Sequence, residues 1–331
     1  MEQILAYIAQ LPPLGLVALL IAGLLLVVFG ADWLVDGASS IARRSGISEF
    51  VIGLTIVGFG TSCPELVVSA NGAIAGNSDV AIGNVIGSNI FNTLLILGLT
   101  AVIMPITITK ANLRRDIPIT LGVTLLLILC GMSHTLFGWG AEDNLTRIEG
   151  AVFLVVFALY IWACFKFDDK SADNTEEQKT LSVAGAIALV LAGLAGLIIG
   201  GKLFVESATH LASSLGVSDK FIAITVLAGG TSLPELATCV VAAAKKKGQL
   251  ALGNILGSNV FNILLILGTA AVIHPISLAG INLVDMGTLL LSAVLVLLSA
   301  FTFKRNQIDR ADGAVFLLCF IAYYVWLFIN L

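Results

Sequence analysis

Two glutamates in apolar surroundings are the residues of this sequence best placed to do chemistry. Each ends a short stretch, Gly-Thr-Ser-Cys-Pro-Glu at residues 60–65 and Gly-Thr-Ser-Leu-Pro-Glu at residues 230–235. The threonine and the serine precede the glutamate by four and three residues, so their oxygens share one helix face with the carboxylate. Hard cations such as Na⁺ and Ca²⁺ take clustered carboxylate and hydroxyl oxygens as ligands. The predicted ligands from these stretches are Thr61, Ser62, Glu65, Thr231, Ser232 and Glu235.

A proline directly before each glutamate predicts that the helix is interrupted there. Pro64 and Pro234 have no amide hydrogen, so each leaves the carbonyl four residues back, which belongs to a glycine, without its helical partner. At membrane depth, an unpaired carbonyl persists only where protein, water or an ion satisfies it. We therefore expect discontinuous helices whose freed carbonyl groups face a bound cation.

A second pair of matching stretches supplies more polar groups. Residues 81–98 read AIGNVIGSNIFNTLLILG and residues 251–268 read ALGNILGSNVFNILLILG, and each places a serine four residues before an asparagine. This spacing gives each helix a short polar stripe. The predicted site residues from these stretches are Ser88, Asn92, Ser258 and Asn262. The other asparagines are expected to hydrogen-bond backbone and neighbouring helices instead; they are Asn84, Asn89, Asn254 and Asn259.

The composition places these motifs in a membrane protein. The chain has 331 residues, of which 58% are hydrophobic and 11% charged, and its mean hydropathy is +1.03. A soluble domain carries roughly 25% charged residues. Ten apolar runs approach the length of about 20 residues that crosses a bilayer; they lie near 14–40, 50–74, 80–104, 114–132, 148–166, 181–211, 220–244, 250–274, 283–303 and 312–330. The first and sixth runs are long, which predicts tilted helices.

The two halves of the chain repeat each other. A constant shift of 170 residues superimposes both motifs of the first half on those of the second, and each half contains five spans. Because five is odd, the second half enters the membrane in the opposite direction. The predicted fold is an all-α membrane protein of ten transmembrane helices in two inverted five-helix repeats, with helices 2 and 7 discontinuous. The predicted units are a first repeat at 1–166 with its motifs at 58–98, a linker at 167–180, and a second repeat at 181–331 with its motifs at 228–268.

The distribution of basic residues predicts the orientation of the chain. Fourteen lysines and arginines fall in one set of alternate loops, and two fall in the other. Because basic loops remain on the cytoplasmic side, we expect the linker to be cytoplasmic and both termini to lie outside. The predicted location is the cell (inner) membrane, which the chain spans many times.

The charges of the two glutamates favour an exchange mechanism. In the inverted arrangement Glu65 and Glu235 meet at the midplane, where inverted-repeat transporters bind their substrates. No lysine or arginine of the central spans pairs with them. Two carboxylates held close in a low dielectric repel each other and take up protons, unless one divalent cation or two or more monovalent cations neutralise them. A site that must always hold one set of ions or the other predicts an exchanger.

Other charged and reactive residues are weaker candidates. Asp32 and Asp36 lie near one end of the first span, where we expect them to stabilise an interface or a gate rather than bind the ion. They correspond to Lys202 and Glu206 of the sixth span, so one acidic residue has become basic. Cys63 stands beside the predicted ligands, but the second copy has leucine at this position. The shared chemistry therefore does not need sulfur.

The doubled pattern also matches that of a known family. Gly-Thr-Ser-x-Pro-Glu followed by Gly-Ser-Asn-x-Phe-Asn-x-Leu-Leu-x-Leu-Gly, present twice in inverted halves, resembles the alpha repeats of the cation/Ca²⁺ exchanger superfamily. Within it, the chain looks like a bacterial sodium/calcium exchanger-type protein of the calcium/sodium antiporter group. The resemblance implies a ten-helix antiporter in which spans two, three, seven and eight hold the ions, while the long spans one and six slide past them.

For the site, the resemblance implies that the two glutamates are calcium ligands and that the hydroxyl and amide positions of both motifs complete the coordination. It adds the backbone carbonyls of Gly58 and Ala228, one turn earlier. Some family members carry an aspartate at one of the two amide positions, whereas Asn92 and Asn262 are both neutral here. This departure leaves the driving ion and the stoichiometry open.

The leading hypothesis is Na⁺/Ca²⁺ antiport by alternating access, with Ca²⁺ and Na⁺ as transported ions, H⁺ or K⁺ as further candidate ions, and no separate cofactor. The lipid bilayer is the other expected partner; no nucleic acid is expected, and we expect the chain to work as a monomer. Exchange of H⁺ for Ca²⁺, or of another cation pair, by the same fold is the alternative. A cation channel lined by the polar stripes is a more remote one. A membrane enzyme with Ser62 or Cys63 as nucleophile lacks a histidine base in the core spans.

Overall fold

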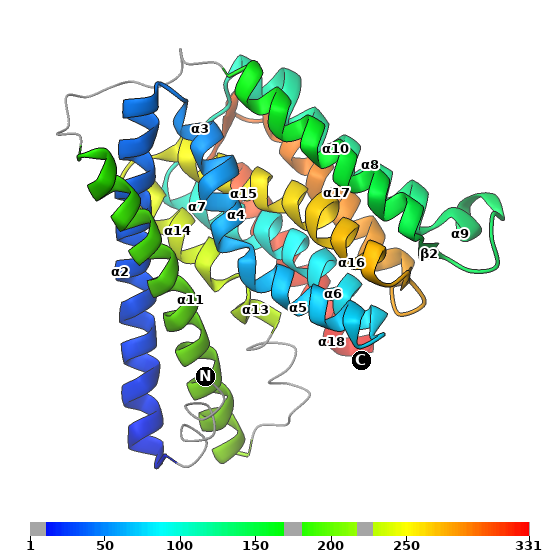
Figure 1. Cartoon of the computed structure of the whole chain (residues 1–331), viewed down its shortest axis with the longest axis horizontal. Coiled ribbons are helices and arrows are strands. Elements are labelled where there is room, and N and C mark those ends of the chain that lie inside the picture. The colour runs from blue at the N-terminus through cyan, green and yellow to red at the C-terminus, as the bar shows by residue number, and fades with distance from the viewer. Residues whose placement is uncertain (1–10, 169–180, 217–227, 331) are drawn as a thin grey trace.

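The computed structural model describes residues 11–168, 181–216 and 228–330, which form helices almost throughout (Figure 1). Two long helices, α2 (Pro13–Ser45) and α11 (Val183–Ser214), run side by side next to a bundle of shorter helices. With 33 and 32 residues, they confirm that the first and sixth spans are long. Most of the polar linker and the start of the seventh predicted span lie outside the described residues.

Glycines hold α2 and α11 together. Gly23, Gly30 and Gly37, which recur every seven residues along α2, all lie against α11. A Cβ atom on Gly30 would lie 2.8 Å from the backbone nitrogen of Leu197. One on Gly193 of α11 would lie 2.6 Å from a backbone nitrogen of α2. Because small residues let two backbones touch, these helices form a tightly packed pair.

The second predicted span is broken, as its proline predicts. It consists of α3 (Glu49–Ile52), the π-helical segment η1 (Gly53–Val57), α4 (Gly58–Thr61) and α5 (Cys63–Ile74). The helix axis bends by 48° between α4 and α5, next to Pro64, which cannot donate a backbone hydrogen bond. The seventh span is interrupted at the equivalent place, between α13 (Ala228–Gly230) and α14 (Leu233–Ala244).

The third and eighth spans are continuous, but each contains a π-helical segment. They comprise α6 (Ser78–Ile90), η2 (Phe91–Leu97) and α7 (Gly98–Ile103), and α15 (Gly248–Val260), η6 (Phe261–Leu267) and α16 (Gly268–Ile273). The outer helices are η3 (Asn112–Asp116) with α8 (Ile117–Gly131), the short α9 (Ser133–Phe137), α10 (Arg147–Lys166), α17 (Leu283–Ser299) and α18 (Arg310–Asn330). Among the described residues, six helices are long and apolar enough to cross a membrane, or seven if the bent pair counts as one. Helix length alone therefore recovers fewer than the ten predicted spans.

Four two-residue strands connect the halves of the molecule in a reciprocal way. β1 (Ile106–Thr107) pairs with β4 (Gln307–Ile308), and β2 (Asn144–Leu145) pairs with β3 (Ile276–Ser277), both antiparallel. Each pair joins one strand of the first repeat to one strand of the second. These strands are not predictable from the sequence, because two residues are too few for an alternating pattern. Their backbone hydrogen bonds join loops of the two repeats at two separate places.

Helix α15 is almost completely buried at the centre of the bundle. All residues in the range 250–260 are buried. A Cβ atom on Gly253 would lie 2.1 Å from the carbonyl oxygen of Phe50, and one on Gly257 would lie 2.4 Å from that of Leu54. The glycines therefore bring the eighth span into backbone contact with the broken second span of the other repeat.

Candidate cation site

The two glutamates of the repeated motif meet through serines of the opposite repeat. Ser62 Oγ donates a hydrogen bond to Glu235 Oε1 at 3.1 Å, and Ser232 Oγ lies 3.3 Å from Glu65 Oε1. Both glutamates are buried, at 1% and 0% exposure. Each serine lies in the break of its span, directly before the second helical part. The interrupted helices therefore gather both carboxylates at one buried place, as the inverted repeat predicts.

Several oxygens of the predicted site are buried without a hydrogen-bond partner among the described residues. They are Glu65 Oε2, Glu235 Oε2, Asn92 Oδ1, Ser258 Oγ and Asn262 Oδ1. A buried polar atom left unsatisfied costs about 1–3 kcal/mol, and more when it is charged. All five are oxygens, the atom type that Na⁺ and Ca²⁺ take as ligands, and Asn259 Oδ1 of the same motif is unpaired as well. This donor set fits a cation.

Hydroxyl groups of both repeats surround the carboxylates. Thr61 and Ser258 lie beside Glu235, and Thr231 lies beside Glu65. The hydroxyls of Ser232 and Ser88 are 3.4 Å apart, which brings the third span to the same place. The structure thus brings together carboxylates and hydroxyls from the second, third, seventh and eighth spans.

The two amide positions lie in the π-helical segments. Asn92 is the second residue of η2 and Asn262 the second residue of η6, and each is 1% exposed. Asn262 donates to Asn89 Oδ1 at 2.9 Å, which leaves its own carbonyl oxygen for another partner. A π-helical turn changes the direction of the side chains within a helix and is frequent at functional sites. The apolar pattern of the sequence did not reveal these turns.

The backbone ligands implied by the family resemblance stay predictions. The Gly58 carbonyl accepts the amide of Ser62 at 3.1 Å, which occupies one of its two lone pairs. Ala228 is the first residue of α13 and borders a stretch outside the described residues. Cys63 Sγ donates to the carbonyl of Phe59, four residues back across the break of the same span, at 3.3 Å, in line with the smaller role expected of it.

The remaining asparagines of the second motif bind the protein framework, which confirms the prediction. Asn89 donates to the Asn259 carbonyl at 3.2 Å, and Asn259 donates to Thr93 Oγ1 at 2.8 Å. Asn84 donates to the Glu65 carbonyl at 3.3 Å. These bonds join the third span to the eighth and to the second. Asn254 bonds to side chains of two other spans, which are described below.

Asp32 and Asp36 lie at a helix interface, as predicted. Lys245, directly after α14, is 2.7 Å from a carboxylate oxygen of each aspartate on α2. Partial burial lowers the pKa of Lys245, but the hydrogen bonds and charges of both aspartates raise it by more, so that its pKa lies above the usual value. This double ion pair fastens α2 to one end of the broken seventh span. Lys245 was not singled out from the sequence, because its partners lie 209 or more residues away.

The packing of α2 and α11 departs from the repeat symmetry. α2 packs along α14, whereas the symmetry-related helices α11 and α5 make no comparable contact among the described residues. The broken helices themselves are related by the repeat. Within the described residues, the long helices therefore pack more closely on the seventh span than on the second.

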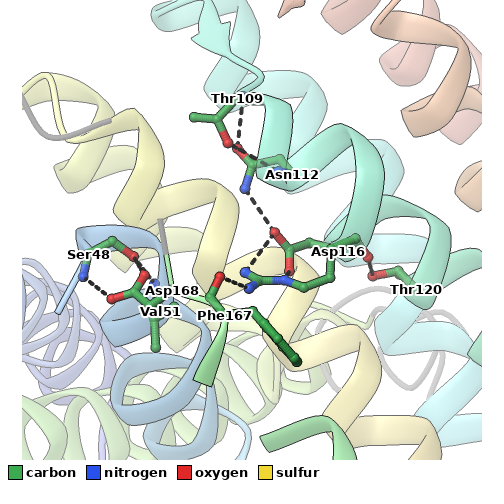
Figure 2. A network of polar contacts seen from close by, with 9 residues as sticks. Ser48, Val51, Thr109, Asn112, Asp116, Thr120, Phe167 and Asp168 are labelled. Carbon is green, nitrogen blue, oxygen red and sulfur yellow. Dashed lines mark hydrogen bonds and ion pairs between the residues drawn. The ribbon is translucent and has the colours of Figure 1, made fainter. Parts of the chain in front are cut away.

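Figure 2 shows another polar network, at the helix ends and outside the two motifs. Asp168, just after α10, accepts hydrogen bonds from the hydroxyl of Ser48 at 2.5 Å and from its amide at 2.9 Å. Arg115 forms an ion pair with the buried Asp116 at 2.7 Å and donates to the carbonyl of Phe167. These contacts fix the end of α10 to the starts of the second and fourth spans.

Comparison with known proteins agrees with this geometry. The family described as "Sodium/calcium exchanger protein" matches residues 15–166 and 185–329. The chain belongs to this family. Its members are membrane transporters for cations, so the enzyme alternative does not hold.

Individual relatives match over most of their length. The sodium/calcium exchanger MaX1 of Methanosarcina acetivorans is 34% identical over 343 residues, covering 94% of this chain and 97% of the relative. The inner membrane protein YrbG of Escherichia coli is 38% identical over 272 residues, covering 78% and 80%. A structure of the sodium-calcium exchanger NCX_Mj soaked with 2.5 mM Na⁺ and 0.1 mM Ca²⁺ matches with a TM-score of 0.81 and 34% identity, covering 94% and 97%.

These matches establish the fold of this chain. It is an all-α, multi-pass membrane protein with ten helices in two inverted repeats and with broken second and seventh helices. The ten spans predicted from hydropathy are therefore correct, although several of the helices are too short to be recognised by length.

Proposed function

We propose that this protein is a secondary antiporter that exchanges Ca²⁺ for Na⁺ across the membrane by alternating access. The observation that carries the proposal is the reciprocal bonding of each motif serine to the glutamate of the other repeat. Glu65 and Glu235 form no ion pair with a basic side chain in the described part of the chain. One Ca²⁺ balances their two charges, and so do two or more Na⁺. The charge balance thus supports a site that alternates between the two ions.

The proposed ligands come from four spans and both repeats. The carboxylates of Glu65 and Glu235 supply the charge, and hydroxyl, amide and carbonyl oxygens supply the remaining coordination. The full proposed set is Gly58, Thr61, Ser62, Glu65, Ser88, Asn92, Ala228, Thr231, Ser232, Glu235, Ser258 and Asn262. The buried unpaired oxygens among these residues support the assignment.

The tightly packed pair α2 and α11 supports alternating access. Its backbones touch at glycines, so the pair is expected to move as one body. It packs against α14 through α2, and in the described part of the chain α11 makes no comparable contact with the equivalent helix α5. Sliding of the pair to the symmetry-related position would close the second side and open the first, and rigid-body movement around a fixed midplane site is how inverted-repeat transporters work.

The names of the relatives agree with the proposal. MaX1 is named a sodium/calcium exchanger, and NCX_Mj is a sodium-calcium exchanger whose structures were solved after soaking with Na⁺ and Ca²⁺ or with Na⁺ and Sr²⁺. YrbG is an inner membrane protein. With the distribution of lysine and arginine, we infer a cell (inner) membrane location, both termini outside, and a cytoplasmic linker at 167–180 between repeats at 1–166 and 181–331.

Calcium flux in everted membrane vesicles tests the proposal. Vesicles from cells expressing the chain are expected to accumulate Ca²⁺ when an outward Na⁺ gradient alone is imposed, and to release it when the gradient is reversed. The same vesicles are then given a pH gradient alone, and the Na⁺ experiment is repeated with and without K⁺. Uptake driven by pH and not by Na⁺ would replace Na⁺/Ca²⁺ exchange by H⁺/Ca²⁺ exchange. Flux that does not saturate and needs no counter-ion would indicate a channel.

A further inference from the structure

Asn254, on α15, reaches across the molecule to a predicted cation ligand. Thr61 Oγ1 lies 3.2 Å from Asn254 Oδ1, although 193 residues separate them. Asn254 is fully buried and Thr61 is 1% exposed. An amide of the second repeat therefore touches a hydroxyl of the first, beside Glu235.

The hydrogen of the Thr61 hydroxyl has three neutral acceptors within reach, and the carboxylate of Glu235 also lies beside it. Asn254 Oδ1 is a buried acceptor, and Thr61 is the donor that the described structure provides for it. Leaving this oxygen unpaired would be costly. The other two acceptors are the carbonyls of Val57 at 3.1 Å and Gly58 at 3.4 Å, and that of Gly58 already accepts the amide of Ser62. When a cation occupies the carboxylates, Asn254 Oδ1 is the side-chain acceptor left for this hydrogen among the described residues, and a hydroxyl that points its hydrogen there keeps its lone pairs for the cation.

A thiol fixes the orientation of the Asn254 amide. Cys239, fully buried on α14, donates toward the carbonyl of Ala251 at 3.8 Å. Its sulfur then has no hydrogen for Asn254 and accepts one from Asn254 Nδ2 at 3.2 Å. With the amide nitrogen directed to sulfur, the amide oxygen must face Thr61. A reversed amide would donate to Thr61 and occupy a lone pair of its oxygen.

The first repeat contains the same pair of hydrogen bonds around the asparagine, with a serine hydroxyl in place of the thiol. Ser69, which corresponds to Cys239, donates to the carbonyl of Ala81 at 3.2 Å and accepts from Asn84 Nδ2 at 3.0 Å. Each of these positions lies 170 residues before its counterpart. Ser69 and Cys239 thus make equivalent hydrogen bonds in the two repeats. Orienting the asparagine therefore requires a group that donates to a carbonyl and accepts from the amide.

We propose that Asn254 is a positioning residue for the cation site. Held by Cys239, it takes the hydrogen of the Thr61 hydroxyl and thereby leaves the oxygen free to ligate Na⁺ or Ca²⁺. A hydroxyl can serve as a cation ligand only through its lone pairs. The inference rests on the proposed function, because it assigns to Thr61 the role of a ligand.

A double-mutant cycle in the purified full-length protein tests this coupling. The half-saturating Ca²⁺ and Na⁺ concentrations are measured from the rise in melting temperature on titration with each ion. Asn254→Leu and Thr61→Val are each expected to raise them about 5- to 10-fold, the loss of about one hydrogen bond. Because both changes remove the same interaction, the double variant should bind no more weakly than Thr61→Val alone. If the two effects multiply, Asn254 does not act through Thr61 and the proposal is wrong.

The thiol supplies a second measurement that does not depend on removing the asparagine. Cys239→Val leaves the amide without its acceptor and should weaken Ca²⁺ and Na⁺ binding by about as much as Asn254→Leu, whereas Cys239→Ser, which copies Ser69, should restore binding toward that of the unchanged protein. Equal weakening by serine and valine would contradict the proposal. Asn254→Asp keeps an acceptor and should retain the coupling to Thr61.

Flux in vesicles separates this inference from the proposed function. Ca²⁺ binding that shows the coupling, without Na⁺-driven flux, would overturn the antiport and support the positioning role. Na⁺-driven flux with independent effects of the two variants would overturn the positioning role alone.

Discussion

Ser62 of the first repeat donates a hydrogen bond to Glu235 of the second across 3.1 Å, although the two residues are 173 positions apart. The inverted counterpart, Ser232 with Glu65, has nearly the same length, 3.3 Å. The serine at each helix break thus hydrogen-bonds to the glutamate of the other repeat. A substitution in one repeat should therefore alter the site as a whole.

The glutamates are expected to be essential for transport. Glu65→Gln and Glu235→Gln each remove one of two charges that balance Ca²⁺, and a buried amide cannot replace a carboxylate toward a divalent cation. Each change should abolish Na⁺-driven Ca²⁺ uptake into everted vesicles while the protein is still inserted in the membrane. Glu149→Gln, in the capping box at the start of α10, is the matched control and should retain uptake. Normal uptake in both site variants would show that these residues are not the ligands.

The serines should have equivalent effects. Ser62→Ala and Ser232→Ala each remove a hydrogen bond to a charged group, worth about 1.5–3 kcal/mol. We expect the half-saturating Ca²⁺ concentration for uptake to rise at least about 10-fold in each. Ser299→Ala is the matched control, because Ser299 is buried on α17 and, among the described residues, its hydroxyl bonds to its own helix, at the carbonyl of Val296. A strong effect of one site variant and none of the other would argue against a shared site.

The contact between the long helices should not tolerate a methyl group. Gly30→Ala would place a Cβ atom 2.8 Å from the backbone of α11, and overpacking of this kind costs about 1–3 kcal/mol. The melting temperature of the purified protein should fall. Gly201→Ala is a control on α11, since a Cβ atom there meets nothing within 4 Å and alanine favours a helix over glycine. A lower melting temperature for Gly201→Ala than for Gly30→Ala would contradict the packing described.

The ion pairs of Lys245 should stabilise the junction of α2 and α14. Lys245→Glu places an acidic group beside Asp32 and Asp36 and should lower the melting temperature, most clearly at low salt, because salt screens exposed charges. Asp36→Lys in that background should recover part of the loss. Lys246→Glu makes the same change of charge on an exposed neighbour and should have little effect. Exposed pairs contribute about 1 kcal/mol or less, so a large effect of Lys246→Glu would show that net charge matters more than pairing.

The same ion pair predicts a pH dependence with a definite sign. The pKa of Lys245 is raised in the folded protein, because the two aspartates outweigh the effect of partial burial. A raised pKa means that this contribution to stability is fully present below the ordinary lysine value of about 10.4 and is lost as the pH rises above it. The difference in melting temperature between the unchanged protein and Lys245→Gln should therefore be constant from about pH 6 to pH 9 and shrink at higher pH. A difference that disappears between pH 6 and pH 8 would assign the effect to another group.

The sequence by itself determined the number of spans, the inversion, the breaks and the chemical composition of the site. Hydropathy gives ten spans, and the odd number in each repeat requires opposite insertion. Pro64 and Pro234 interrupt their helices because proline lacks the amide hydrogen. Comparison of the two repeats separates the site residues present in both from residues that differ, such as Cys63, which corresponds to Leu233. Each of these features depends on local composition or on comparison of one half with the other.

Only the tertiary structure decided which groups meet. Ser62, at the 48° bend of its span, bonds to Glu235 of the other repeat, 173 residues away, although Glu65 is only three residues further along the chain. The π-helical turns at Asn92 and Asn262, the ion pairs of Lys245 and the contact between Thr61 and Asn254 leave no periodic trace in the sequence. They arise where helices from distant parts of the chain pack against each other, and that packing cannot be read from the order of residues along the chain.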